Sequence, residues 1–188
     1  MIDRDNLQKD QINDELRDRA LVDLLDGPVT PSNIVDIPAL VIKLNGLIAT
    51  AVVAWLSGEQ YGSIVSGAQG KRASQLLSRC ADAARAQARD LAGRVTQLGG
   101  APEFDLALIR QRAHTNYREF APANCTGMVA ETLLGLRVVI QLYQEYVRWI
   151  GDRDPTSRRL LERILERNEA DADELRSFLS DRSANLEI

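Results

Sequence analysis

Four long segments of this 188-residue chain repeat apolar residues every three or four positions, and this periodicity is the feature that most restricts its fold. Such spacing places the apolar side chains on one face of an α-helix. The first segment covers about residues 39–62, the second follows a turn at 67–71 and ends at 98, and the others cover about 127–150 and 155–179. Helices of this length need partners for their apolar faces, so the pattern predicts an all-α bundle of four helices.

The connections between these segments differ in length. The first two are separated by a short glycine-containing turn, and the last two by the residues 151–155. Roughly residues 101–123 separate the second from the third; they hold a predicted short helix and the only histidine, His114, which we interpret as a surface residue. Asp154 and Pro155 are typical of a helix N-cap and first turn. We therefore expect two helix pairs joined by one long crossover.

A separate helix is predicted at the N-terminus. Residues 1–26 alternate leucines with charges, with eight Asp or Glu against four Lys or Arg, and Gly27-Pro28 ends the pattern. We expect residues 1–33 to form an amphipathic helix and connector that packs on the bundle or on a neighbouring subunit. Residues 34–182 are then the bundle itself.

Charge and composition exclude several classes of partner. The formal net charge is −4 and the N-terminal segment is acidic, which opposes binding to nucleic acid. The most apolar stretch, residues 34–56, is interrupted by Asp36, Lys43 and Asn45, so we expect no membrane span. Two cysteines make no disulfide framework and no signal peptide is visible, so a cytoplasmic location is predicted.

The apolar stripe of the last segment contains two polar residues. Asn168 and Asp171 lie at the spacing of Leu161, Ile164 and Leu175, so their side chains are expected to face inward. In bundles that bind metals through carboxylates, an inward pair at i and i+3 is where Glu and His lie. In this segment the two inward positions have the same spacing, but they hold Asn and Asp instead of Glu and His.

Two local strings resemble a known family. Residues 97–104 (QLGGAPEF) are similar to the end of the second helix in bacterioferritin-like and Dps-like ferritins, and residues 143–152 followed by 154–161 are similar to that family's entry to its fourth helix. The resemblance extends over about residues 24–179. It implies a ferritin-like four-helix bundle with a long crossover between the second and third helices, plus the extra N-terminal helix.

The resemblance also indicates which positions correspond to the family's metal ligands. The family's ligands are one glutamate on the first helix, a Glu-x-x-His pair on the second, one glutamate on the third and a Glu-x-x-His pair on the fourth. In that order, these substituted positions are Ala51, Ala84, Gln87, Leu136, Asn168 and Asp171. Only Asp171 is a carboxylate, whereas two bridged iron ions need several anionic oxygens. We predict no metal at these positions, and a hydrogen-bonded cluster of the polar residues, or recruitment of an arginine such as Arg137.

These substitutions determine the predicted function. A haem cofactor is not expected either, because neither methionine, Met1 or Met128, lies on the second helix. We predict a non-catalytic ferritin-like subunit without cofactors, with a structural or assembly role in a homo-oligomer or together with an active ferritin-like paralogue. The alternative is iron oxidation and storage through relocated or intersubunit ligands.

Overall fold

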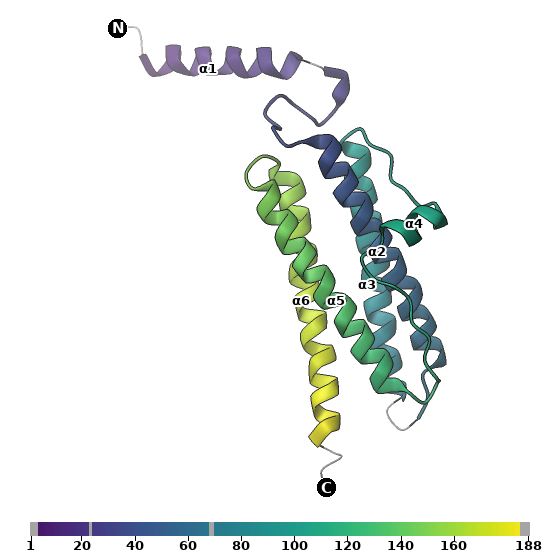
Figure 1. Ribbon diagram of the computed structural model, residues 1–188. Helices are drawn as coiled ribbons and strands as arrows, with labels where there is room; N and C mark the ends of the chain where they lie inside the picture. Colours follow the sequence, from purple (N-terminus) through teal and green to yellow (C-terminus); the bar gives the residue numbers. More distant parts are fainter. Residues whose placement is uncertain (1–3, 23, 68–69, 185–188) are drawn as a thin grey trace.

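The computed structural model describes residues 4–22, 24–67 and 70–184, and all regular structure within these ranges is helical. Figure 1 shows the arrangement. The elements, in chain order, are α1 (Arg4–Leu21), a short 3-10 helix η1 (Leu24–Asp26), α2 (Ile37–Ile64), α3 (Gly70–Gln97), α4 (Leu106–Arg112), α5 (Cys125–Ile150) and α6 (Pro155–Ala184).

Two antiparallel pairs, α2 with α3 and α5 with α6, form the bundle, and the crossover that carries α4 joins them (Figure 1). This confirms the predicted all-α topology. The four bundle helices begin and end within a few residues of the predicted bounds. The division into a segment 1–33 and a bundle 34–182 stays a prediction.

The helix ends follow from local sequence. Asp36 caps α2 by accepting a 3.0 Å hydrogen bond from the backbone N–H of Ala39, and Asn124 caps α5 in the same way through Gly127. Asp154 accepts from the backbone N–H of Ser157, which confirms the cap predicted for α6. After α5 the chain turns at Gly151, whose φ of 53° lies in the left-handed region that glycine adopts without strain.

The N-terminal helix differs from the expectation. It ends at Leu21 rather than near residue 26, and its first three predicted residues lie outside the described part of the chain. In Figure 1 it extends away from the bundle instead of packing on it, and packing on a neighbouring subunit stays a prediction. Ile12, Leu16 and Leu21 are all about half exposed or more, because its apolar stripe is too weak to fix it against one surface.

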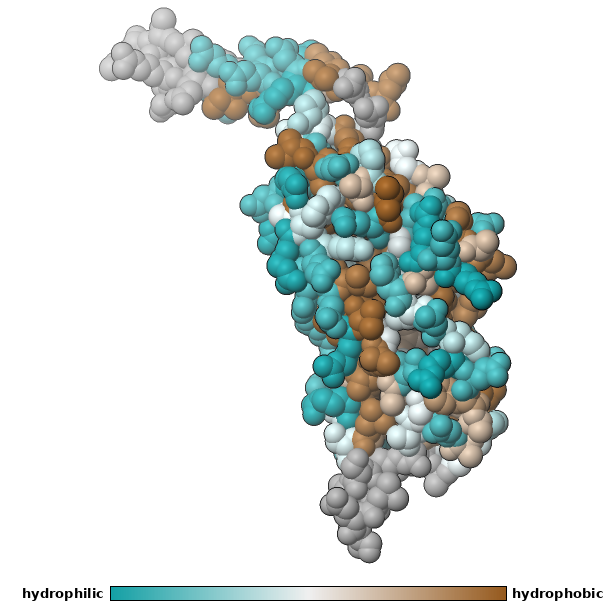
Figure 2. Space-filling model, viewed as in Figure 1, coloured by the Kyte–Doolittle hydropathy of each residue, from teal (hydrophilic) through white to brown (hydrophobic). Residues whose placement is uncertain are grey.

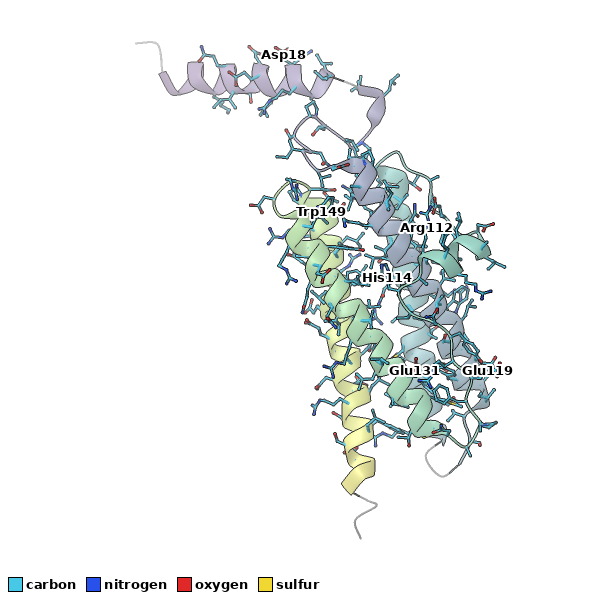
Figure 3. The ribbon with its side chains drawn as sticks, viewed as in Figure 1. Asp18, Arg112, His114, Glu119, Glu131 and Trp149 are labelled. Atoms are coloured by element: carbon cyan, nitrogen blue, oxygen red, sulfur yellow. The ribbon has the colours of Figure 1, made fainter. Side chains whose placement is uncertain are left out.

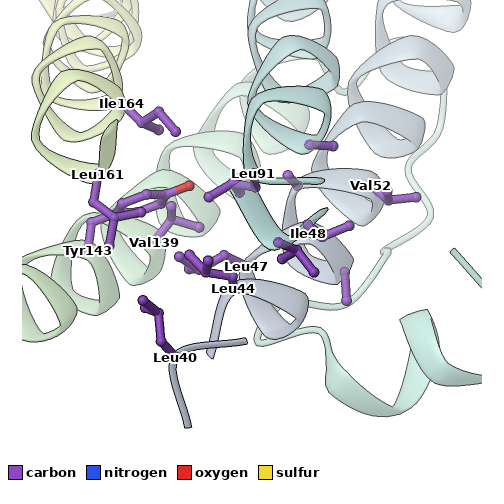
Figure 4. Close-up of a cluster of buried hydrophobic side chains, with 14 of the residues drawn as sticks. Leu40, Leu44, Leu47, Ile48, Val52, Leu91, Val139, Tyr143, Leu161 and Ile164 are labelled. Atoms are coloured by element: carbon purple, nitrogen blue, oxygen red, sulfur yellow. The ribbon is translucent and has the colours of Figure 1, made fainter. Parts of the chain in front are cut away.

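The core consists of two clusters, one toward each end of the bundle. The larger cluster packs α2 leucines against α3, α5 and α6, and Figure 4 shows it with Leu40, Leu44, Leu161 and Ile164 among its buried members. The second lies at the opposite end and includes Leu77, Met128, Leu175 and Phe178. Between Ile164 and Leu175 on α6 lie Asn168 and Asp171, so the polar pair falls where the two clusters meet.

Helices α2 and α3 approach closely at a glycine. A Cβ atom added to Gly58 would lie 2.9 Å from the Cβ of Ala81 and 3.1 Å from the carbonyl oxygen of Leu77. Both atoms belong to the partner helix and have little freedom to move. Gly58 therefore sets the distance between the two helices at this level.

Polar side chains on α2 hold the crossover against the bundle. Asn45 donates to the carbonyl of Ala101 at 3.1 Å and accepts from the N–H of Glu103 at 3.1 Å. One and a half turns on, Thr50 accepts from the N–H of His114 at 3.0 Å. Near the end of the helix, Tyr61 donates to the carbonyl of residue 118 at 2.6 Å. These bonds explain why polar residues interrupt the most apolar helix.

By length and composition alone, two of the described helices, α2 and α5, are apolar enough to cross a membrane. The apolar window of α2 is 56% buried inside the bundle, as expected of a core helix. That of α5 is only 22% buried, so this helix keeps an apolar surface facing outward.

Candidate functional site

A cavity of about 310 Å³ lies at the centre of the bundle, between the two core clusters. All four bundle helices and the crossover contribute to its wall. Its lining is mostly apolar, with a few polar groups. Figure 2 shows the surface hollowed between α5 and the α2–α3 pair, beside an apolar stripe over α5 and α6.

The six positions that the sequence singled out all line this one cavity. They come from four different helices: Ala51, Ala84, Gln87, Leu136, Asn168 and Asp171. The structure thus brings them together, as the inward stripes predict. That they correspond to the ligand positions of the resembling family stays a prediction.

Two buried amides face each other across the cavity. Gln87 Nε2 on α3 donates to Asn168 Oδ1 on α6 at 2.6 Å, so two of the three residues of the predicted polar cluster are hydrogen-bonded to each other. The other amide group of Asn168, Nδ2, has no hydrogen-bond partner although the residue is fully buried. The hydroxyl of Tyr143 on α5 is also without a partner at 1% exposure. Two hydrogen-bonding groups at the cavity are therefore unsatisfied.

Asp171 is paired with an arginine, but not with the one that was suggested. Arg79 Nε on α3 lies 3.7 Å from Asp171 Oδ1, whereas Arg137 is exposed on the outside of α5. Arg137 was the wrong candidate because its side chain is exposed and does not line the cavity, whereas its neighbour Leu136 does. Burial raises the pKa of Asp171 above its ordinary value, and the positive charges of Arg79 and Arg167 offset only part of that effect.

The donor set does not fit a pair of iron ions. Asp171 is the one carboxylate among the six positions, and Arg79 already offsets its charge. Cys80 also lines the cavity, but burial raises the pKa of its thiol to about 12, so it remains neutral at pH 7. Glu131 is 3.0 Å from Arg118 in an ion pair. Across the described ranges, no three His, Cys, Asp or Glu residues are grouped to hold a metal.

His114 lies at the open side of the cavity. Figure 3 shows His114 between α5 and α2, and Glu131 on α5 lines the same cavity. Its Nδ1 is 3.0 Å from Thr50 Oγ1, and Thr50 Oγ1 itself donates to the carbonyl of Gly46 at 2.8 Å. His114 Nδ1 is therefore the donor to Thr50. Partial burial lowers the pKa of His114, which favours the neutral ring. The residue is exposed, as predicted, but forms part of the cavity rim.

Sequence reasoning missed three residues of this site. Tyr143 lies in the periodic segment 127–150, and nothing in its spacing signals that the hydroxyl lacks a partner. Arg79 and Thr50 were not singled out. A signal for Thr50 does exist, since it is a polar residue inside the apolar helix α2.

Comparisons with known proteins agree with this fold. The model of the family described as ferritin-like domain matches residues 42–183. Among solved structures, the chain is similar to a bacterioferritin-related protein from Bacteroides fragilis, described as a dodecameric thioferritin, with 21% identity, a TM-score of 0.79, and coverage of 82% of this chain and 92% of that one. Dps from Thermosynechococcus elongatus has 20% identity, a TM-score of 0.71, and coverage of 76% and 90%. A Dps homologue from Halobacterium salinarum has 22% identity, a TM-score of 0.70, and coverage of 76% and 80%. The comparison with curated proteins gives no match.

Proposed function

Because the chain belongs to the ferritin-like domain family, we propose that it is a ferritin-like subunit that lacks di-iron ferroxidase chemistry in its own bundle and has a structural or assembly role. In this proposal the four-helix frame is kept for its shape and its surfaces. The centre of the bundle no longer binds the metal for which such frames are used in other proteins.

One observation carries the proposal: the six inward positions at the bundle centre converge on one cavity and offer a single carboxylate. Two adjacent divalent cations need several anionic oxygens to offset their charge. Ala51, Ala84 and Leu136 have no ligand atom in their side chains, and the amides of Gln87 and Asn168 bind each other.

Assembly is supported by the surface. Several large apolar side chains are at least half exposed, including Ile42 and Leu56 on α2, Leu106 on α4 and Leu134 on α5. Exposed apolar surface of this kind is commonly buried against another subunit. The Bacteroides fragilis relative is described as dodecameric. We propose a homo-oligomer, or co-assembly with an active ferritin-like subunit.

Aerobic oxidation of ferrous ions by the purified protein, compared with an intact bacterioferritin, tests this proposal. We expect a rate close to that of buffer. A variant that restores the family's ligand pattern is the matched control and should gain activity or metal binding: Ala51→Glu, Ala84→Glu, Gln87→His, Leu136→Glu, Asn168→Glu and Asp171→His. Rapid, saturable oxidation by the unmodified chain would instead support relocated or intersubunit ligands and overturn the proposal.

A further inference from the structure

We propose that the central cavity is a binding site for a small uncharged organic molecule that carries an oxygen acceptor, such as a ketone or an ester. The inference builds on the proposed function, because it assigns a different ligand to the space that a metal centre would fill. It rests on three features of the cavity: its unsatisfied donors, the charge of its wall and its shape.

Two hydrogen-bond donors at the cavity lack partners. Tyr143 Oη and Asn168 Nδ2 are both buried, and both residues line the cavity. Figure 4 shows the Tyr143 hydroxyl directed toward the middle of the bundle, near Leu91. An unsatisfied buried polar group costs about 1–3 kcal/mol, so a ligand acceptor that reaches either donor would gain more than it would from a solvent-exposed contact. The complementary ligand atom is a carbonyl or ether oxygen.

The deep wall of the cavity disfavours a charged ligand. Burial keeps the Tyr143 hydroxyl protonated by raising its pKa, and the Cys80 thiol is neutral as well. An anion would meet the carboxylate of Asp171 without a free cation beside it, since the Arg118 side chain at the rim is paired with Glu131. A cation would meet the carboxylates of Asp171 and Glu131, whose charges Arg79 and Arg118 offset.

Size and access suit a small organic molecule. A volume of about 310 Å³ lies at the lower end of the range for ligand pockets, which is ~300–1,000 Å³. The body of the ligand would contact Ala51, Ala84 and Val139. Exposure increases from the fully buried Asn168 to His114 at the rim, so the cavity opens beside the crossover.

Ligand-observed NMR with three probes of matched shape tests this inference on the full chain. Acetophenone carries the acceptor oxygen, ethylbenzene lacks it, and benzoate is the anionic counterpart. We expect acetophenone to bind more tightly than the other two. Tyr143→Phe should weaken acetophenone binding roughly threefold to tenfold and leave ethylbenzene unchanged, because it removes one hydrogen bond and no volume.

Two further variants make the result specific to the cavity. Ala84→Leu fills the space and should abolish binding of acetophenone. Tyr146→Phe is the matched control, since Tyr146 lies on the same helix outside the cavity, with Lys43 Nζ 4.6 Å from its ring centre; it should bind like the unmodified chain. Thermal unfolding checks that each variant folds, and Tyr143→Phe should not be less stable because its hydroxyl has no partner.

Three results would overturn the inference: no binding of acetophenone, equal binding of acetophenone and ethylbenzene, or no effect of Tyr143→Phe. Each of these leaves the proposed function intact if ferrous oxidation is absent. Displacement of acetophenone by two ferrous ions per chain would instead contradict the proposed function.

Discussion

Asn168 illustrates what a single polar residue does inside an otherwise apolar stripe. Its position on α6 places it in the core, where its side-chain oxygen accepts from Gln87 and its nitrogen has no partner. The residue is buried at a cost that only the Gln87 bond offsets. The effect of replacing Asn168 on the stability of the fold should therefore depend strongly on whether Gln87 is replaced as well.

The amide pair gives a paired prediction. Asn168→Leu alone should lower the free energy of unfolding by about 1–3 kcal/mol, because Gln87 is left buried without its partner. Gln87→Leu together with Asn168→Leu should recover most or all of that loss, since apolar residues then replace both partners. Urea unfolding of the three proteins measures this. A double variant less stable than the single one would show that the pair serves something other than mutual satisfaction.

The carboxyl of Asp154 makes the stability of the fold depend on pH. Burial would raise the pKa of its carboxyl, but hydrogen bonds from Ser157 and Arg94 outweigh this, and the pKa is lowered from its ordinary value of 3.8. Arg94 Nη2 lies 2.9 and 2.8 Å from the two carboxylate oxygens and ties α3 to the start of α6.

A carboxyl with a lowered pKa stabilises the fold above its unfolded pKa, and this contribution is lost as the pH falls through the folded value. We therefore expect the melting temperature of the unmodified chain to fall more steeply below about pH 4 than that of Asp154→Asn. At neutral pH the variant should be the less stable of the two. Parallel pH profiles of the two proteins would contradict this role.

At the scale of helices, the inward stripes were predictable because a long helix must bury one face. The α6 stripe from Leu161 to Leu175 is buried at each predicted step, and the caps follow from local side chains. The pairing of Asp171 with Arg79 was not predictable, because it depends on which helix faces which turn. The outward course of α1 was not predictable either, since a weak stripe does not specify a partner surface.

Two glycines on the first helix pair give a matched test of packing. Gly58→Ala should destabilise the fold by about 1–3 kcal/mol, because the added Cβ meets Ala81 and the backbone of Leu77. Gly93→Ala, on the exposed side of α3 with no atom within 4 Å of the added Cβ, should stabilise it by about 0.5–1 kcal/mol. Thermal unfolding distinguishes the two; equal effects would show that α2 and α3 are not in close contact at Gly58.

For the molecule as a whole, the exposed apolar residues of α1, α2 and α5 lead us to expect self-association. Sedimentation at micromolar concentration should give a mass well above the 20.8 kDa of one chain. A chain that begins at residue 34 should assemble into fewer subunits if α1 contributes contacts between them. A strictly monomeric 188-residue chain would contradict the assembly role.

A ferritin-like subunit without ferroxidase chemistry requires a bundle centre that does not hold a pair of metal ions. Anomalous diffraction from crystals grown with excess ferrous or zinc ions measures this directly. We predict no pair of fully occupied ions between Ala51, Gln87, Leu136 and Asp171, and metal peaks only in the variant with restored ligands. Two fully occupied ions between the four helices of the unmodified protein would contradict the proposed function.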